Sequence, residues 1–283
     1  MWNLPPPPGF QGLRPDQPIT VYQRHLPHWR QDGATYFVTF RLADSLPQSK
    51  LDELAALKEA WERQHPRQHP PPSGTALPSR RATVPKSRPT DELARQLRQH
   101  PPSGTALPSR RATVQESRPT DELARQLQER IERWLDQGMG SCPLKQPSLA
   151  AFLTSAMHHF DDDRYELDCY VVLPNHAHVI VRPLMPTTHP IEAIVGSWKK
   201  YSSRRINRAL QQTGDLWQDE SYDRLVRDEE HLWRAIQYIG ANPDKAGLAR
   251  ESCPMWIRPQ WVEFGWRFDG PGLGPTARES RPT

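Results

Sequence analysis

The stretch LPNHAHVIV, residues 173–181, constrains the fold more than any other part of the sequence. Its β-branched run predicts a strand, and side chains two apart on a strand point to the same face of a sheet. The Pro174–Asn175 pair is a turn signal, so we expect His176 and His178 side by side where the strand begins. Two such imidazoles could bind one divalent ion and leave it open to a substrate oxygen. Two surface histidines on an edge strand would have the same spacing.

The remaining periodicities predict the fold class. Strands are expected over 35–41 and 164–173, and residues 216–226 are expected to be at least partly extended. Helical periodicity covers 51–63, 120–135, 148–160, 189–210 and 228–240, and Pro243 predicts that the last helix ends near Asn242. This order predicts an α+β fold, a ferredoxin-like sandwich with an antiparallel sheet and helices on one face.

Low-complexity segments divide the chain. Residues 73–84 (SGTALPSRRATV) recur as 103–114, within a Pro- and Arg-rich insertion at about 65–119. Such copies have too few large apolar residues for a solenoid, so we interpret them as a duplicated surface linker, with nucleic-acid contact as the alternative. Residues 1–21 are predicted to be a proline-rich flexible tail, 22–250 the catalytic domain, and 251–283 a mostly irregular C-terminal extension.

Composition limits the cellular setting. Cys142, Cys169 and Cys253 form no Cys-x-x-Cys pair, which argues against a zinc ribbon or a disulfide framework. The N-terminus lacks the apolar run of a signal peptide, and no stretch approaches the length of a membrane span. We therefore expect a cytoplasmic protein with no membrane partner. A net charge of +4 is only mildly basic, so the clustering of charges matters more than their sum.

The last predicted helix adds candidates for chemistry. Tyr238 and Asn242 are four residues apart and share one helix face. A tyrosine beside a metal ion can attack phosphorus, and an amide oxygen can complete the metal's ligands. A core aromatic with a hydrogen-bonded hydroxyl is the alternative interpretation of Tyr238.

A basic segment precedes that helix. Its aromatic residues Trp198 and Tyr201 are interleaved with the cations of Lys199, Lys200, Arg204, Arg205 and Arg208. Cations that follow a phosphate backbone and rings that stack on unpaired bases are typical of single-strand DNA binding. An ordinary solvated helix face has the same composition, and Tyr201 is a second candidate nucleophile.

Several motifs together give the chain a resemblance to a known family, the REP-associated tyrosine transposases, within the single-tyrosine superfamily that has a His-hydrophobic-His signature. The resemblance covers about residues 22–64 and 120–250. The motifs are RHLPHW (24–29), GATYFVTFRLADSLP (33–47), VLPNHAHV (172–179), GDLWQ (214–218), SYDRLVRD (221–228) and YIGANPDKAGL (238–248). The duplicated insertion departs from the family pattern.

The resemblance implies a function for these residues. His176, His178 and Asn242 would bind Mg²⁺ or Mn²⁺, and Tyr238 would attack a DNA phosphate to leave a 5′-phosphotyrosine and a free 3′-hydroxyl. The substrate would be single-stranded or hairpin DNA from palindromic repeats. Whether Tyr238 acts in its own subunit or in that of a homodimer partner is left open. A nucleic-acid-binding protein that no longer cuts, and a phosphodiesterase that uses water, are the alternatives.

Overall fold

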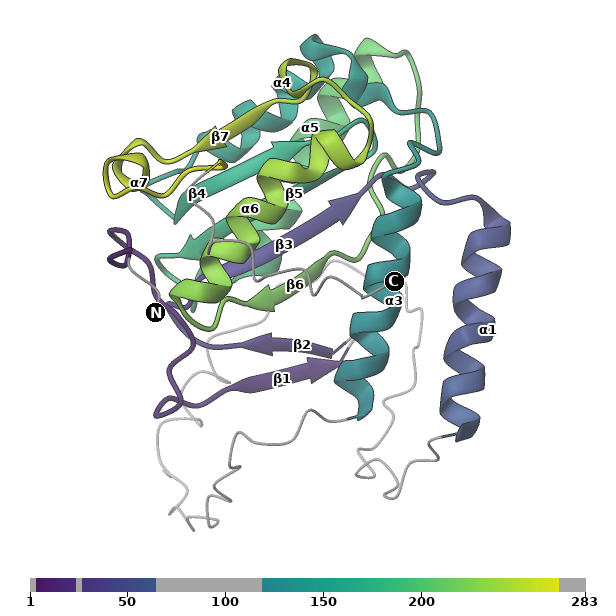
Figure 1. Cartoon of the computed structure of the whole chain (residues 1–283). Coiled ribbons are helices and arrows are strands. Elements are labelled where there is room, and N and C mark those ends of the chain that lie inside the picture. The colour runs from purple at the N-terminus through teal and green to yellow at the C-terminus, as the bar shows by residue number, and fades with distance from the viewer. Residues whose placement is uncertain (1–3, 24–26, 65–118, 270–283) are drawn as a thin grey trace, which may run out of the picture.

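The computed structural model describes residues 4–23, 27–64 and 119–269, and its central feature is a five-stranded antiparallel sheet (Figure 1). The strands lie in the order β6-β3-β5-β4-β7. Their bounds are β3 Tyr36–Arg41, β4 Tyr165–Val172, β5 His176–Pro183, β6 Tyr222–Leu225 and β7 Met255–Ile257. A separate two-stranded sheet pairs β1 (Thr20–Gln23) with β2 (Pro27–Arg30).

The order of helices and strands matches the predicted class. The helices are α1 Gln48–Gln64, α3 Pro119–Leu135, α4 Pro147–His158, α5 Ile191–Ala209, α6 Glu229–Lys245 and α7 Pro259–Glu263, with short 3-10 helices η1 Pro143–Lys145 and η2 Arg250–Ser252. The prediction of an α+β fold with an antiparallel sheet is confirmed. In chain order, β3-α4-β4-β5-α5-β6 is the β-α-β-β-α-β succession of ferredoxin-like sandwiches.

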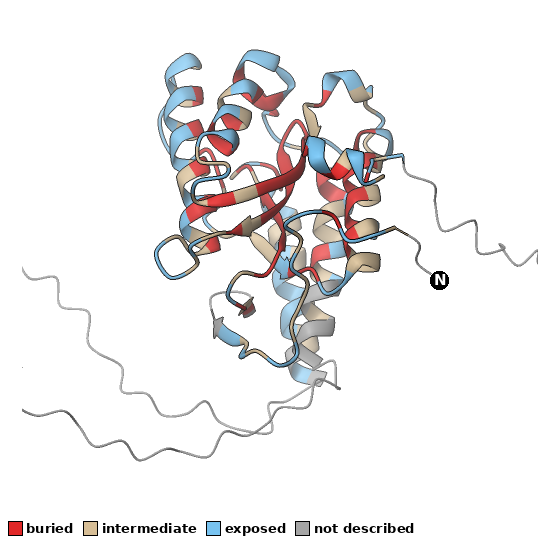
Figure 2. Ribbon diagram, turned by 90° about the vertical axis from the view of Figure 1, so that its left-hand side faces the viewer, coloured by how far each residue is buried: buried red, intermediate tan, exposed pale blue. Residues whose placement is uncertain are grey.

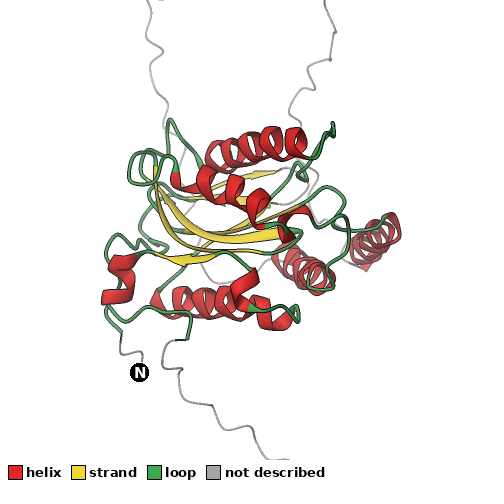
Figure 3. Cartoon of the chain, turned by 90° about the horizontal axis from the view of Figure 1, so that it is seen from above, coloured by secondary structure: helices red, strands yellow, loops and turns green. Residues whose placement is uncertain are grey.

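Both faces of the sheet are covered, so the prediction of helices on one face was wrong. One core cluster joins Val38 and Val179 of the sheet to α4 and α5, and the other joins Phe37 and Ile180 to α6. Figure 3 shows helices on both sides of the strands. The physical reason is that β3 and β5 are buried along nearly their whole length, without the polar alternation of a half-exposed strand (Figure 2).

A tight turn connects β4 to β5 and sets the position of the histidines. The Leu173 amide donates to the His176 carbonyl at 2.9 Å, and Pro174 and Asn175 form the turn between them. The ladder then pairs Val171 with His178. The predicted turn and the strand that begins at His176 are both confirmed.

Helix α6 continues past the predicted end near Asn242 and reaches Lys245, with Pro243 inside its last turn. Proline biases the preceding residue away from the helical region. Here the Asn242 side-chain amide donates to the Tyr238 carbonyl at 2.6 Å, and the Ala246 amide donates to the Asn242 carbonyl at 3.0 Å. These two bonds hold Asn242 in helical conformation and offset the bias.

The described part of the proline-rich head packs against the C-terminal segment, so the prediction of a flexible tail does not hold for residues 4–21. The indole N–H of Trp261 donates to the Pro8 carbonyl at 2.8 Å, and that of Trp266 to the Pro5 carbonyl at 2.9 Å. A buried indole N–H needs such an acceptor. The segment 251–269, expected to be mostly irregular, supplies β7 and α7.

The predicted duplicated insertion lies outside the described residues except for Pro119. Within the described ranges, no helix is both long enough and apolar enough to cross a bilayer.

Candidate functional site

The alternation of β5 places the side chains of His176 and His178 on the sheet face that α6 covers. Their Nε2 atoms lie 3.1 Å apart, so the two imidazoles converge on one point. Both residues are fully buried, with exposed fractions of 1% and 0%. The alternative of two surface histidines on an edge strand is excluded, because β5 lies between β3 and β4.

Hydrogen bonds fix the orientation of both rings. The Asn175 side-chain amide donates to the carbonyls of Leu135 and Met139, so its Oδ1 must accept from His176 Nδ1, at 2.8 Å. The proton of a neutral His176 therefore sits on Nδ1, and Nε2 carries the lone pair. His178 Nδ1 lies 2.8 Å from the Thr39 hydroxyl, which can donate or accept and therefore suits either tautomer. Partners of this kind orient histidines that bind metals.

Burial keeps both histidines neutral. It lowers the pKa of His176 well below its ordinary value, and the neighbouring His178 adds to this effect. Burial, with the positive charges of Lys245 and Arg224, lowers the pKa of His178 to about 3. Neutral imidazoles have lone pairs free for a ligand at physiological pH.

Helix α6 brings Tyr238 and Asn242 to the same face of the sheet as the histidines. The Tyr238 ring packs edge-on against His178, with ring centroids 5.2 Å apart, and also against Phe37. Asn242 is fully buried, and a contact with its side chain raises the pKa of His178 against the effect of burial. Its Oδ1 has no hydrogen-bond partner among the described residues. An unpaired buried acceptor is uncommon and calls for an explanation.

These donors fit a divalent ion. Two ligand nitrogens at about 2.1 Å from one ion are separated by about 3.0 Å at a right angle and about 3.4 Å at the tetrahedral angle. The observed 3.1 Å between the Nε2 atoms of His176 and His178 falls in this range. In the described part of the chain, no group of three or more His, Cys, Asp and Glu side chains could hold a metal. A third protein ligand beside the histidines would therefore be an amide oxygen, and the unpaired Oδ1 of Asn242 has the required chemistry.

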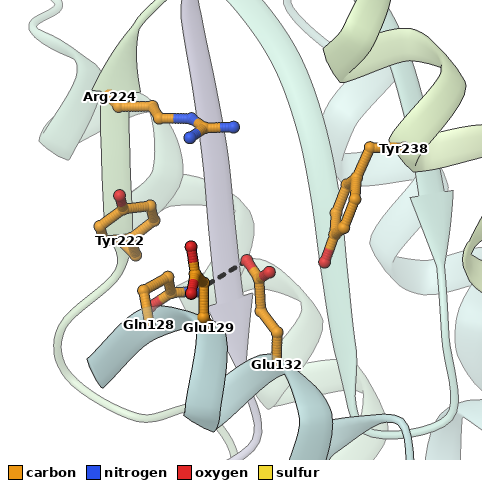
Figure 4. Close-up of a pocket in the computed structure, with 6 residues that line it drawn as sticks. All are labelled: Gln128, Glu129, Glu132, Tyr222, Arg224 and Tyr238. Carbon is orange, nitrogen blue, oxygen red and sulfur yellow. Dashed lines mark hydrogen bonds between the residues drawn. The ribbon is translucent and has the colours of Figure 1, made fainter. Parts of the chain in front are cut away.

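Beside the histidines, the Tyr238 side chain lines a cavity of about 100 Å³. Figure 4 shows its hydroxyl pointing toward Glu132 of α3, whose carboxylate accepts from the Gln128 side chain at 3.1 Å. Burial and the Glu132 carboxylate both raise the pKa of Tyr238 well above its ordinary value. The phenol is therefore protonated at neutral pH. The interpretation of Tyr238 as a purely core aromatic is weakened, because the ring is half-buried and opens onto a cavity.

Two cations lie near Tyr238. Arg224 on β6 lines it, with its guanidinium 5.1 Å from the centre of the Phe37 ring. Lys245, on the last turn of α6, has its ammonium 4.0 Å from the centre of the Tyr238 ring. Both side chains belong to exposed residues. Positive charge thus lies beside the candidate nucleophile.

The predicted DNA-binding residues lie elsewhere. Helix α5 packs in the core cluster of the opposite sheet face, so its basic residues are across the sheet from His178. Lys199 donates to the carbonyls of Gln218 and Asp219, and Arg205 lies 5.1 Å from the Phe152 ring centre. The other three form an exposed stripe at four-residue intervals, Lys200, Arg204 and Arg208. Tyr201, the second candidate nucleophile, is 46% exposed on this same helix and is not near the histidines.

Sequence reasoning missed four residues of this site. Lys245 is seven residues after Tyr238 and shares its helix face. It was missed because the helix was predicted to end near Asn242, before Lys245. Thr39 and Arg224 depend on strand register, which the sequence does not specify. Glu132 comes from α3, beyond the long insertion, and no local pattern indicated its position.

Comparisons with known proteins give one structural match. No protein-family model and no curated protein sequence matches the chain. Among solved structures, the chain is similar to a REP-associated tyrosine transposase bound to a REP hairpin. The match has 13% identity and covers 82% of this chain and 76% of that one, with a TM-score of 0.29. A TM-score this low does not establish a shared fold, so the functional interpretation depends on the residues of the site.

Proposed function

We propose that this chain is a metal-dependent DNA transposase that nicks single-stranded DNA and transfers the strand through a 5′-phosphotyrosine intermediate, on hairpin or palindromic repeat DNA. The observation that carries the proposal is the position of Tyr238 on α6, with its ring 5.2 Å from that of His178, whose Nε2 lies 3.1 Å from Nε2 of His176. The motif resemblance to REP-associated tyrosine transposases supports the same function.

The chemistry follows from the groups present. The Tyr238 oxygen attacks phosphorus, the bond from phosphorus to the 3′-oxygen breaks, and the phenol proton leaves while the 3′-oxygen gains one. A phenol is a poor nucleophile near neutral pH, because its ordinary pKa is about 10. A Mg²⁺ or Mn²⁺ ion held by His176, His178 and Asn242 would polarise the phosphate and offset the developing charge. The covalent intermediate retains the bond energy, so no nucleotide cofactor is required for strand transfer.

The exposed stripe of α5 suits a second role in this proposal. Lys200, Arg204 and Arg208 are across the sheet from Tyr238, too remote in the fold to act on the phosphate that is cut. We propose that they bind the backbone of the same DNA away from the cleavage point, such as the stem of a hairpin. Neutralising them would weaken binding and reduce its salt dependence, with little effect on the rate of cleavage at saturating DNA.

A covalent-adduct assay tests the catalytic proposal. The protein is incubated with Mn²⁺ and a 3′-labelled hairpin oligonucleotide, and denaturing gels report DNA that migrates with protein. We expect an adduct with the wild type and none with Tyr238→Phe or in EDTA. Tyr201→Phe is the matched control, since it removes the other candidate hydroxyl and is expected to retain the adduct. If Tyr238→Phe forms as much adduct as the wild type, the proposal is wrong.

One observation favours the alternative of a nucleic-acid-binding protein that does not cut. Burial and Glu132 raise the pKa of Tyr238, which makes the nucleophilic phenolate scarcer. Under this alternative, the labelled oligonucleotide would bind and stay intact, and binding would survive His176→Ala. Cleaved product free of protein would instead indicate water as the nucleophile.

A further inference from the structure

Within the described part of the chain, Arg224 and Lys245 have no carboxylate partner, unlike several other arginines around the sheet. The guanidinium groups of Arg182, Arg250 and Arg258 each form an ion pair with a neighbouring carboxylate, at 2.5, 2.8 and 3.7 Å respectively. Among the described residues, neither Arg224 nor Lys245 lies within 4.0 Å of a carboxylate oxygen, although Arg224 lines a cavity that also contains acids and Lys245 lies over the ring of Tyr238, which lines the same cavity. Exposed, unpaired cations beside a cavity are suited to binding an external anion.

Strand register brings Arg224 to the right face of the sheet. It pairs with Phe37 across the β3–β6 ladder, and Tyr222 pairs with Thr39, which in turn pairs with His178. Arg224 is therefore two residue pairs along the ladder and two strands away from His178, on the same face of the sheet.

Helix periodicity brings Lys245 to the same place from the other side. It lies two turns after Tyr238 on α6, and its ammonium is over the Tyr238 ring. The two cations thus come from different elements, β6 and α6, and lie over the rings of Phe37 and Tyr238, which pack against each other.

The acids of the cavity come from a different element. Glu129 and Glu132 both belong to α3, so the cavity has an acidic wall on α3, and Arg224 of β6 supplies a cation on another side (Figure 4). An anion that enters is repelled from α3 and attracted toward Arg224, with Lys245 beside the Tyr238 ring. This separation of charge would direct a phosphodiester to the side where the histidines lie.

We propose that Arg224 and Lys245 form a phosphate-binding site that holds a backbone phosphodiester of single-stranded DNA beside the Tyr238 hydroxyl. The inference rests on the proposed function for the identity of the ligand. A guanidinium can contact two oxygens of one phosphate, whereas an ammonium acts as a point charge. Arg224 would therefore orient the phosphate, and Lys245 would add attraction.

Binding without cleavage tests the site directly. In a Tyr238→Phe background, fluorescence anisotropy would give the Kd of a labelled hairpin oligonucleotide over a series of NaCl concentrations, in EDTA. Arg224→Gln and Lys245→Gln are each expected to weaken binding and to reduce the slope of log Kd against log[NaCl] by about 0.7, the value for one single-strand phosphate contact. Arg224→Lys retains the charge and should retain the slope. Arg164→Gln is the charge-matched control, because this partly exposed arginine precedes β4 at the opposite end of the β4–β5 ladder from His176.

The rate of adduct formation distinguishes a failure of the phosphate site from a failure of the proposed catalytic function. With Tyr238 restored and DNA saturating, Arg224→Gln should slow adduct formation, whereas the control Arg164→Gln should not. Slopes and adduct rates like those of Arg164→Gln would overturn the phosphate site while the transposase function stands. Reduced slopes in a protein whose wild type forms no adduct would support the phosphate site and count against the catalytic function.

Discussion

Replacing Asn242 with leucine should stabilise the protein without metal and weaken its response to metal. Asn242 is fully buried, and its Oδ1 has no hydrogen-bond partner among the described residues. Its amide nitrogen donates to the Tyr238 carbonyl at 2.6 Å. A residue selected only for packing would not keep an unpaired acceptor in an apolar cluster, whereas a metal ligand would.

The expected magnitudes follow from these contacts. Relief of a buried unpaired acceptor contributes about 1–3 kcal/mol, and the lost bond to the Tyr238 carbonyl costs about 1 kcal/mol. The free energy of unfolding should therefore rise by about 0–2 kcal/mol, which corresponds to a Tm increase of up to about 8 °C for a domain of this size. Metal at a hundred times its Kd stabilises the wild type by about 2.7 kcal/mol, and a tenfold weaker Kd reduces this to about 1.4 kcal/mol.

Thermal unfolding followed by circular dichroism measures both effects. Tm is recorded for the wild type and Asn242→Leu in EDTA and over a series of Mn²⁺ concentrations. The control is Asn207→Leu on α5, where the side-chain amide donates to the Gly214 carbonyl at 2.8 Å far from the histidines. This control should lose stability and keep the full response to Mn²⁺.

The reasoning fails if Asn242→Leu is much less stable than the wild type in EDTA and keeps the full Mn²⁺ response. Asn242 would then be a structural residue whose main role is the bond to the Tyr238 carbonyl. The metal would have to be held by the histidines and by groups outside α6.

Two further predictions concern charged groups. Glu132→Gln should lower the pKa of Tyr238, because it removes a neighbouring negative charge. The difference in absorbance at 295 nm between this variant and its Tyr238→Phe double mutant measures the titration of Tyr238. A midpoint equal to that of the wild type would contradict the effect assigned to Glu132. Burial acts to lower the pKa of His28, but its 2.7 Å hydrogen bond with Asp223 and the negative charges of Asp223 and Glu220 together outweigh this and raise the pKa above 6.5. Protonated His28 thus stabilises the fold below pH 6.5, and this contribution is lost as the pH rises through the pKa of His28 in the folded state. His28→Gln should therefore lower Tm more at about pH 5.5 than at about pH 8.5. An equal loss of Tm at both pH values would refute the pairing of His28 with Asp223.

Local patterns predicted those parts of the fold that depend on nearby residues. The strand that begins at His176 and the helices around Leu153 and Trp198 were all indicated by periodicity and turn chemistry. The same local rule gave the wrong end of α6, because it counted the effect of Pro243 and not the bond that the Asn242 side chain makes to its own helix. A side chain that compensates for proline is not visible in a periodicity.

Tertiary arrangement was less accessible. The continuous apolar character of VIV in β5 indicates a strand buried on both faces, which should have predicted a helix on each side of the sheet. The basic residues of α5 and the pair Tyr238–Asn242 were expected to act together. Helix α5 packs on one apolar face of the sheet and α6 on the other, so the two sets lie on opposite sides of the sheet. Sequence spacing shows which residues share a helix face but not which face of the sheet that helix covers.

The candidate site is assembled from three parts of the chain that have different structural roles. The histidines belong to the central strand of the sheet, so their convergence depends on the core itself. Tyr238, Asn242 and Lys245 belong to α6, which follows the ferredoxin-like unit and covers its free face. Glu132 belongs to α3, outside that unit, and has no part in the main core clusters. Substitutions on this surface of α3 should therefore change the reactivity of the tyrosine with little effect on folding, whereas substitutions at the histidines or Thr39 should affect both.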